Sequence, residues 1–421
     1  MAMYYSYRVP RAMPFWNGPT YRAILRSLTS GSVVDGAALS ELRSLLIQTL
    51  GIEAARLTGS GSLALELALR GCDVGHSDEV IIPAFCCSAV VPPVLALGAL
   101  PVLADIGAEL NLTVETVDAV ITRRTRAVIV PHLFGNPADI QGIVDLARSR
   151  NIRVIDDAAQ ALGATIDGQP VGSFGDAGIV SFGAEKICFG LGGGAVVSSR
   201  QKFFDGDAPN LSPAKSAVVV RQLMATQMRW RWRRWTLPLQ MMLPSDNSGG
   251  PNALPTPYRT ETMVNLQAAV ALSLMRSLSE NMAARRERLR FYQDFLGAED
   301  RLELIPHRPG SACLNLVVRV SPGGHGRDLA AALIAALDKS GYEIQGSYMP
   351  IHLLGCFDRC VWDHLPNADR VWRDLIELPC DPGVRLEDVE RISTVVKKFV
   401  RADTGYGRSR AGSGFIQISK N

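Results

Sequence analysis

Two carboxylates and one lysine stand at points in the chain where buried strands should end. Asp156 and Asp157 close an apolar run that begins at Val154, and Lys186 follows the apolar run at 177–182. In open α/β sheets, ligands bind outside the carboxyl ends of the strands. If the two runs form neighbouring strands, they present an acid and an amine to one cleft.

That pairing suits pyridoxal phosphate. This cofactor needs a lysine for a Schiff base and an acid beside its pyridine nitrogen, which stays protonated so that the ring accepts electrons. The simpler interpretation is that the aspartates form a solvated turn or helix cap and that the lysine is a surface residue. The two segments alone leave both interpretations open.

A turn of small residues, Gly59–Ser62, precedes a helix that is rich in alanine and leucine. Free backbone N–H groups at the positive end of a helix dipole bind phosphate, and Gly61 and Ser62 are the expected contacts. An ordinary capped helix would show the same sequence pattern.

Apolar runs alternate with helical segments up to about residue 200. The expected strands are 80–85, 100–105, 126–131, 153–157 and 177–182, and the expected helices are 36–50, 88–97, 113–121 and 139–150. The runs lack polar alternation, which indicates helices on both faces and predicts a mostly parallel, doubly wound sheet. Farther on, we expect a long helix at 265–296, a strand at 313–320, and helices at 327–340, 368–376 and 386–401.

The composition is that of a soluble globular enzyme, with 47% hydrophobic and 20% charged residues in 421. A net charge of +3 gives no general case for nucleic-acid or membrane partners. We find no apolar run that could span a bilayer and no secretory signal. The eight cysteines include no Cys-x-x-Cys pair, so we expect no metal site, reduced thiols and a cytoplasmic protein.

The segment 229–235 interleaves arginine with tryptophan. Such a segment can bind an anionic group, for example a diphosphate, or nucleic acid by charge and stacking, so Arg229 and Arg231 are candidate substrate contacts. The alternative, which we favour, is a lid or subunit contact in which arginine stems pack on tryptophan.

Several short stretches, taken in order, resemble the DegT/DnrJ/StrS family of pyridoxal-phosphate-dependent sugar aminotransferases. They are Gly59–Leu65, Asp78–Pro83, Gly98–Val102, Pro131–Gly135, Asp157–Gln160, Ser181–Phe182 with Lys186, and Gly193–Val197. Each stretch is weak alone, but their order and spacing together are specific. The resemblance covers most of 14–200 and, more weakly, 262–400.

The resemblance implies an α/β protein with the fold-type I aminotransferase architecture. A large domain would hold a mostly parallel seven-stranded sheet flanked by helices, and a smaller α+β domain would follow. We expect an N-terminal arm and helix at 1–50, the large domain at 51–262 with an atypical insertion at 201–262, a linker helix and small domain at 263–401, and a flexible tail at 402–421.

The resemblance also implies roles for individual residues. Lys186 would be the catalytic residue that holds the cofactor and moves protons. The cofactor would further contact Asp157 at its pyridine nitrogen, Gln160 near its phenolic oxygen, and Gly61, Ser62 and Ser181 at its phosphate. Tyr348 and His352 match a segment near the family's substrate entrance and are candidate substrate contacts.

Three positions depart from the family's pattern. Cys87 stands in the cofactor site where the family usually places an aromatic side chain over the ring. The segment Tyr258–Met263 lacks the asparagine that normally reaches a neighbouring subunit's phosphate, and Arg259 is a candidate substitute. Gly192 replaces an acidic residue. These changes, with the insertion, indicate an atypical substrate or a divergent branch.

The implied activity is transfer of an amino group from an amino acid, glutamate or glutamine, to a keto group of a nucleotide-linked sugar. Retention of Lys186 favours transamination, because the family's dehydratases carry histidine there. A homodimer with shared active sites is implied as well. The alternatives are a cyclitol or another small ketone as acceptor, and a divergent cofactor-binding protein with a regulatory role.

Overall fold

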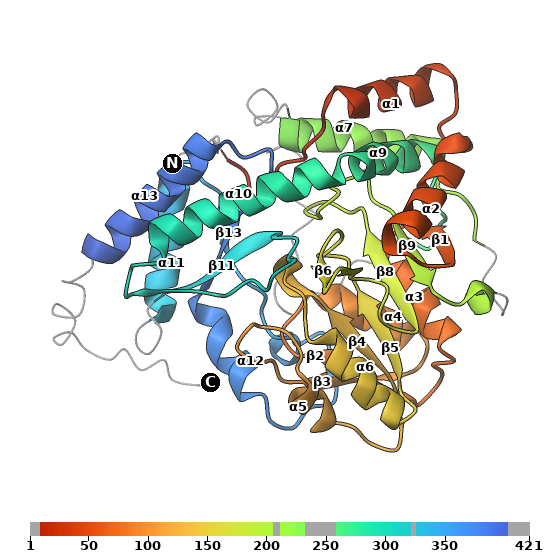
Figure 1. The fold of residues 1–421 in the computed structure, drawn as a ribbon, viewed down its shortest axis with the longest axis horizontal. Helices are drawn as coiled ribbons and strands as arrows, with labels where there is room; N and C mark the ends of the chain where they lie inside the picture. Colours follow the sequence, from red (N-terminus) through yellow and green to blue (C-terminus); the bar gives the residue numbers. More distant parts are fainter. Residues whose placement is uncertain (1–8, 205–210, 232–257, 321–325, 403–421) are drawn as a thin grey trace, which may run out of the picture.

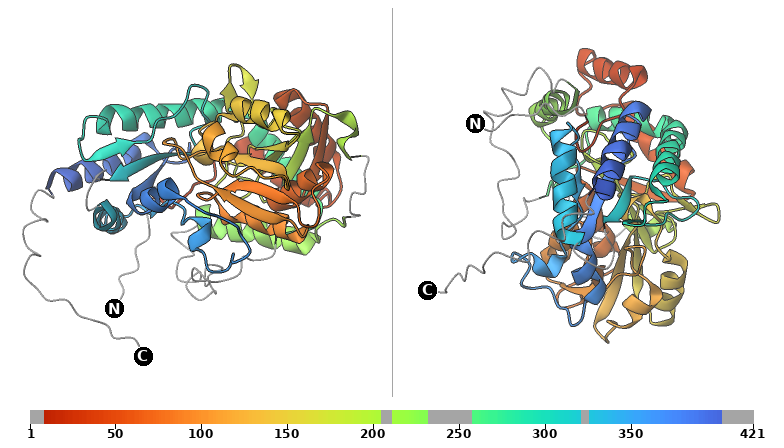
Figure 2. Two further views of the ribbon diagram at one scale, coloured as in Figure 1. Left: turned by 90° about the horizontal axis from the view of Figure 1, so that it is seen from below. Right: turned by 90° about the vertical axis from the view of Figure 1, so that its left-hand side faces the viewer.

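The computed structural model describes residues 9–204, 211–231, 258–320 and 326–402 (Figure 1). The rest of the chain, which includes the expected tail beyond Ala402 and most of the Arg/Trp-rich segment, lies outside the described residues. Two sheets with their helices lie side by side in the views of Figure 2.

The larger sheet has seven strands in the order β1-β9-β8-β5-β4-β2-β3. Its strands are β1 (Ala54–Thr58), β2 (Glu79–Pro83), β3 (Leu100–Ala104), β4 (Thr125–Pro131), β5 (Arg153–Asp157), β8 (Ala177–Ser181) and β9 (Gly194–Ser198). From β8 to β3 all neighbours run parallel, whereas β9 is antiparallel to both β8 and β1. The expectation of a mostly parallel seven-stranded sheet is confirmed.

Helices cover both faces of this sheet, which explains why its strands are apolar without alternation. On one face lie α1 (Gly18–Thr29), α2 (Ala37–Leu50) and α9 (Asn265–Arg276), in one core with Val180 of β8. On the other lie α3 (Gly61–Gly71) and α4 (Val91–Ala96), in a second core with Ile179. Adjacent residues of one strand therefore serve opposite faces.

The smaller sheet has four antiparallel strands in the order β10-β11-β13-β12. These are β10 (Leu302–Leu304), β11 (Asn315–Val320), β12 (Gln345–Gly346) and β13 (Leu375–Pro379). The helices α10 (Leu278–Leu296), α11 (Gly326–Lys339) and α13 (Leu386–Ala402) pack against it around a separate core. This arrangement is the smaller α+β part that the resemblance implied.

Shorter elements complete the chain. They are η1 (Ser88–Val90), α5 (Val114–Asp118), η2 (Leu133–Gly135), α6 (Ile140–Ser149), β6 (Thr165–Ile166), β7 (Gln169–Pro170), η3 (Gln201–Phe204), α7 (Ser216–Thr226), η4 (Gln227–Arg231), η5 (Ile351–Leu353), α12 (Pro366–Val371) and η6 (Trp372–Asp374). The strand β1 and the short strands β6, β7, β10 and β12 were not predicted from the sequence.

Two sequence-based expectations about elements are wrong. The helix expected at 265–296 is two helices, because Ser277 takes a non-helical conformation (φ −102°, ψ 16°) and ends α9 before α10 begins. The helix expected at 368–376 ends earlier, and Leu375 and Ile376 belong to β13. The strand β13 lies between β11 and β12 and pairs with both, all its residues are buried, and this outweighs its helical sequence pattern.

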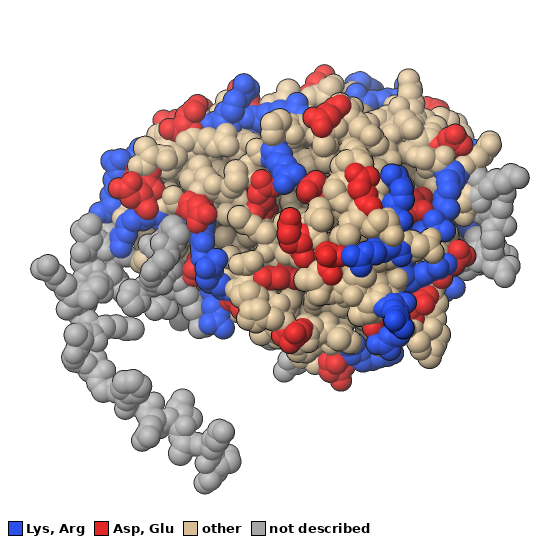
Figure 3. Space-filling model, turned by 60° about the horizontal axis from the view of Figure 1, so that its bottom comes forward, with Lys and Arg blue, Asp and Glu red and all other residues tan. Residues whose placement is uncertain are grey.

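The surface carries mixed charge. Figure 3 shows Lys and Arg interspersed with Asp and Glu over the face in view, in keeping with the net charge of +3 for the chain. Across the described ranges, every helix is too short or too polar to cross a bilayer.

Candidate active site

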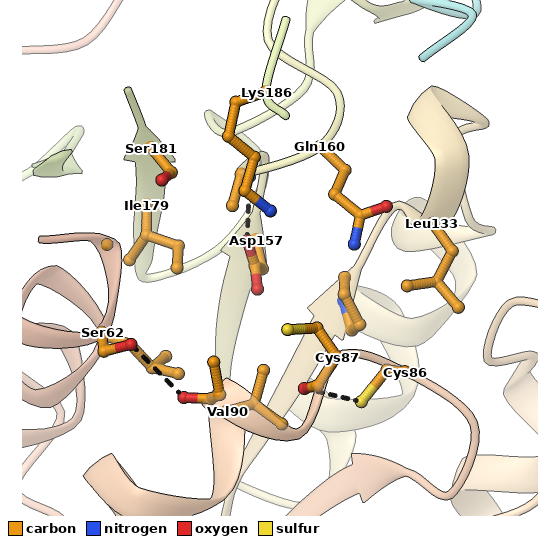
Figure 4. A pocket seen from close by; sticks show the side chains of 15 residues that line it. Ser62, Cys86, Cys87, Val90, Leu133, Asp157, Gln160, Ile179, Ser181 and Lys186 are labelled. Carbon is orange, nitrogen blue, oxygen red and sulfur yellow. Dashed lines mark hydrogen bonds between the residues drawn. The ribbon is translucent and has the colours of Figure 1, made fainter. Parts of the chain in front are cut away.

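One cavity lies at the carboxyl ends of β4, β5 and β8, beside the N-terminus of α3 (Figure 4). All the cofactor-binding residues named from the sequence line it: Gly61, Ser62, Cys87, Asp157, Gln160, Ser181 and Lys186. Its apolar walls come from Leu65, Val90, Leu133 and Ile179. The parallel sheet thus brings together residues that are far apart in the sequence.

Asp157 is a buried acid at the end of β5, with 5% of its surface exposed. Its Oδ1 accepts a hydrogen bond from the Ala159 N–H at 2.9 Å. Burial raises the pKa of the Asp157 carboxyl, and the Ala159 N–H and the charges of Lys186 and His132 oppose this shift. An acid in such surroundings is stabilised in its charged form by a cationic partner.

Its neighbour Asp156 points to the other face of the strand and has a structural role. His132 donates from Nε2 to Asp156 Oδ1 at 2.7 Å, because its Nδ1 accepts the Ala138 N–H at 2.8 Å. Oδ2 accepts the N–H groups of Gly172 and Phe174 at 2.7 and 3.0 Å. Asp156 is therefore fully bonded away from the cavity, and Asp157 alone of the pair lines it.

Lys186 lies in the loop between β8 and β9, and its amine lies above Asp157 in Figure 4. The preceding Glu185 has a left-handed backbone (φ 63°) and pairs with Arg11 at 3.0 Å.

Side chains from three other segments donate hydrogen bonds to carbonyl oxygens of this loop. Trp16 donates to Phe189 at 2.7 Å, Asn281 to Ile187 at 3.1 Å and Gln267 to Leu191 at 2.9 Å. These contacts fix the loop that carries the lysine.

The N-terminus of α3 forms one end of the cavity. Ser60 caps the helix by accepting the Leu63 N–H at 3.1 Å. A Cβ added to Gly61 would lie 3.1 Å from the Ser181 side chain, a tight contact, so glycine favours this close approach of the helix start to β8. The backbone N–H groups of the first turn and the hydroxyls of Ser62 and Ser181 are suitable donors for a phosphate dianion.

Cys87 occupies the wall opposite Lys186, and its sulfur points into the cavity in Figure 4. Cys86 turns away and donates to the Pro83 carbonyl at 3.4 Å. As far as the described residues go, no aromatic side chain lines this cavity. The sequence predicted that an aromatic ring is missing at position 87. Among the described residues, no other aromatic side chain takes its place in the cavity lining.

Three of the substrate candidates, Tyr348, His352 and Arg229, are not among the residues that line the cavity. Tyr348 contacts the lining residue Gln160, because its hydroxyl accepts a hydrogen bond from Gln160 Nε2 at 3.1 Å. His352 pairs through Nε2 with Asp369 at 2.8 Å. Arg229 stacks on Trp230, with its guanidinium carbon 4.8 Å from the ring centroid. The side chain of Arg231 lies outside the described part of the structure.

The region around the expected insertion packs on the lysine loop. The ring of Trp230 meets Phe189 edge-on at 5.6 Å, and the Arg229 guanidinium lies over Trp230. A lid or subunit contact for this segment stays a prediction. Arg259 donates to Gln222 Oε1 at 2.9 Å. Gly192 has a positive φ of 82°, which explains a glycine in that turn.

Several residues that shape the site were not named as site residues from the sequence. Trp16, Asn281 and Gln267 support the lysine loop from distant segments, and Leu133 and Ile179 supply apolar walls. Side chains of these types are common in every helix and strand, so only their tertiary contacts distinguish them. In the described ranges no cluster of His, Cys, Asp and Glu is arranged to hold a metal ion.

The model of the DegT/DnrJ/EryC1/StrS aminotransferase family matches residues 19–205 and 257–397. The chain belongs to this family. The interval between the two matched stretches contains the Arg/Trp-rich segment 229–235, which therefore departs from the family's common pattern. Family membership makes the chain an aminotransferase, as the sequence predicted.

Two relatives are about equally similar to this chain. The UDP-N-acetyl-3-dehydro-alpha-D-glucosamine 3-aminotransferase of Acidithiobacillus ferrooxidans is 31% identical over 349 residues, which cover 80% of this chain and 82% of the relative. The GDP-perosamine synthase of Caulobacter vibrioides is 30% identical over 362 residues, with 85% and 88% covered.

The fold extends to enzymes with another reaction. Escherichia coli GDP-4-keto-6-deoxy-D-mannose-3-dehydratase, solved with bound hydrated PLP, has a TM-score of 0.73 and 19% identity to this chain; 92% of this chain and 99% of the dehydratase are covered. The fold-type I architecture expected from the sequence is confirmed. Fold alone does not separate transamination from dehydration, so the site residues must.

Proposed function

We propose that this aminotransferase uses pyridoxal phosphate to move an amino group from glutamate or glutamine to a keto group of a nucleotide-linked sugar. The observation that carries the proposal is the cavity itself. It places the Lys186 amine above the buried Asp157, with the N-terminus of α3 at one end. These are the three groups that the cofactor's aldehyde, ring nitrogen and phosphate require.

The residues present fit the cofactor. Lys186 would hold it, Asp157 would pair with the ring nitrogen, and Gln160 would lie at the phenolic edge. The phosphate would be held by Ser62, Ser181 and the first N–H groups of α3. When bound, the cofactor supplies the electron-accepting ring for the transfer.

The chain's own groups then have separable tasks. Among the described residues that line the cavity, Lys186 is the one that carries an amine, and its Nζ accepts and donates the proton that is moved. Asp157 would keep the ring nitrogen protonated, because a buried carboxylate is stabilised in its charged form by a cationic partner. Leu133, Val90 and Ile179 exclude water from the reacting groups.

The acceptor class rests on the relatives. Both named relatives act on or make sugars linked to a nucleoside diphosphate, one on a UDP-linked and one on a GDP-linked sugar. Lys186 stands where the resemblance places histidine in dehydratases, and this supports transamination over dehydration. We further propose that the enzyme is a homodimer with shared sites and works in the cytoplasm, where its free cysteines stay reduced.

Absorbance spectroscopy tests the proposal. Purified protein supplied with pyridoxal phosphate should develop a visible band that bleaches with glutamate and returns with a keto-sugar nucleotide. Borohydride should fix the cofactor on Lys186, as seen by peptide mass. Lys186→Ala should abolish band and transfer, whereas Lys215→Ala, at an exposed lysine before α7, should preserve both. A band that no amino donor changes would instead support a regulatory protein.

A further inference from the structure

The orientation of the Gln160 amide is determined by its neighbours. The backbone N–H of Phe134 donates to Gln160 Oε1 at 2.9 Å, and a backbone N–H can only donate. The amide nitrogen must therefore face Tyr348, whose hydroxyl oxygen lies 3.1 Å from Nε2. An amide nitrogen carries two N–H groups, and Tyr348 accepts only one of them. The other is available to the cavity that Gln160 lines (Figure 4).

The backbone that orients Gln160 is itself in an unusual conformation. Phe134 has a left-handed backbone, with φ 57° and ψ 18°, and is followed by Gly135 with φ 78°. Such a conformation is costly for phenylalanine and persists where surrounding contacts enforce it. Here the N–H groups of Ala312 and Leu314 bond to the carbonyls of Gly135 and Phe134 at 2.8 and 2.9 Å.

The ring of Tyr348 is held in place on the same side. It stacks on Phe134 with a centroid distance of 5.8 Å and an interplanar angle of 27°, and it meets Phe85 edge-on at 6.0 Å. Just beyond it, the Ile351 N–H donates to the Ala84 carbonyl at 2.7 Å. The hydroxyl of Tyr348 therefore has little freedom to leave Gln160.

Tyr348 stays a neutral phenol. Burial raises the pKa of its hydroxyl well above the ordinary tyrosine value; the charge of Glu377 acts in the same direction, and the charge of Arg11 opposes it. A phenol with a raised pKa does not ionise to serve as a base near neutral pH. Its role is then to accept the hydrogen bond and to hold the amide.

We propose that Tyr348 is a positioning residue, which fixes the Gln160 amide so that one N–H is presented to the edge of the cofactor ring. The inference rests on the proposed function, because Gln160 was assigned to the phenolic oxygen there. It differs from the role expected from the sequence, in which Tyr348 was a substrate contact. Tyr348 acts through Gln160, and the segment that follows β12 thereby orients a residue in the turn that follows β5.

The inference predicts a spectroscopic effect. An N–H that donates to the phenolic oxygen competes with the proton on the lysine-linked cofactor and lowers the pKa of the visible chromophore. Tyr348→Phe keeps the ring stack but frees the amide, so this chromophore pKa should rise by roughly 0.5–1 unit. In a Gln160→Ala background, Tyr348→Phe should cause no further shift, since the pair acts as one unit.

Tyr292→Phe is the matched control. Tyr292 is fully buried and donates to the Pro379 carbonyl at 3.4 Å in the smaller core, away from Gln160. It should leave the chromophore pKa unchanged. An unchanged pKa in Tyr348→Phe, or the same shift with and without Gln160, would overturn the inference.

A second measurement keeps the inference independent of the cofactor. Thermal unfolding of the cofactor-free wild type, of both single variants and of the double variant should give non-additive changes in Tm, because the hydroxyl and the amide bond each other in the protein alone. Additive changes would overturn the inference. A wild type without a visible band would refute the proposed function instead, and this cycle would still decide the role of Tyr348.

Discussion

At the residue scale, the site keeps its charged groups and has lost an aromatic one. Asp157 and Lys186 line one cavity, as the proposed cofactor site requires, but the position where the resemblance implies an aromatic ring carries the Cys87 thiol. An aromatic pair contributes about 0.5–1.5 kcal/mol beyond the area it buries. Loss of the stack should therefore leave cofactor retention more dependent on the Schiff base and the phosphate contacts.

Restoring the ring tests this account. Cys87→Phe should lower the Kd of pyridoxal phosphate by about 2–10-fold, the factor that such a stacking energy corresponds to. Cys87→Ala should change the Kd less, because it neither adds a ring nor removes a hydrogen bond in the site. Equilibrium dialysis against the cofactor measures both. A folded Cys87→Phe protein with equal or weaker binding would show that the thiol wall has another purpose.

At the element scale, the lysine loop is supported by the chain's N-terminal segment. Val9 pairs with the smaller sheet's periphery through Gly341, with its N–H 3.2 Å from that carbonyl, and Arg11 and Trp16 then contact the loop that carries Lys186. One short segment thus connects the smaller sheet, the lysine loop and α1. Of the three side-chain hydrogen bonds to carbonyl groups of this loop described above, the one from the Trp16 indole N–H to the Phe189 carbonyl is the shortest, at 2.7 Å.

Trp16→Phe should loosen the lysine loop. The substitution leaves the Phe189 carbonyl without its donor, at a cost of about 1–2 kcal/mol, and amide hydrogen exchange over 183–193 should speed up. Trp372→Phe is the control, because the buried Trp372 Nε1 has no hydrogen-bond partner among the described residues. Equal exchange in Trp16→Phe and wild type would show that the other contacts suffice to hold the loop.

At the scale of the whole molecule, the segment 305–314, which leads into β11 of the smaller sheet, contacts the turn after β4 of the larger sheet. Asn136 donates to the Pro306 carbonyl at 3.0 Å, and Ser311 donates to the Gly135 carbonyl at 2.8 Å. His307 lies in this junction, 2.8 Å from Ser311 Oγ through Nδ1. Burial lowers the pKa of His307 to about 4. The junction therefore requires an uncharged imidazole.

The lowered pKa predicts acid sensitivity of this junction. The unfolded chain takes up a proton near the ordinary histidine pKa, whereas the folded chain resists protonation down to about pH 4. Stability is therefore present above pH 6.5 and is lost as the pH falls towards 4. Between pH 7 and 5 the free energy of unfolding should fall by roughly 2 kcal/mol more in the wild type than in His307→Gln.

Urea unfolding at a series of pH values measures this difference. His76→Gln, at an exposed histidine, is the control and should follow the wild type. If His307→Gln keeps the full acid sensitivity, other buried groups must account for it.

The large sheet and its cofactor cavity could be predicted because their signals are local. Strands such as β2 and β8 are covered on both faces, so an apolar run marks each of them, and the cavity residues follow at the strand ends. Asp157, Gln160 and Lys186 were assigned to one site on this basis and on the resemblance. Their placement around one cavity agrees with that assignment.

Other features depend on contacts between distant residues, which a sequence pattern does not contain. Leu375 and Ile376 look helical alone, but both pair with β11, and Ile376 also pairs with β12, which makes them a strand. Tyr348 looked like a substrate contact, but its hydroxyl accepts from Gln160, whose amide is oriented by the N–H of the left-handed Phe134. Local free energies differ by about 1 kcal/mol or less per residue, and burial and hydrogen bonds formed across the fold exceed them. The sequence by itself therefore indicated which residues could carry out the chemistry. Only the tertiary structure decided which other residues hold them in position.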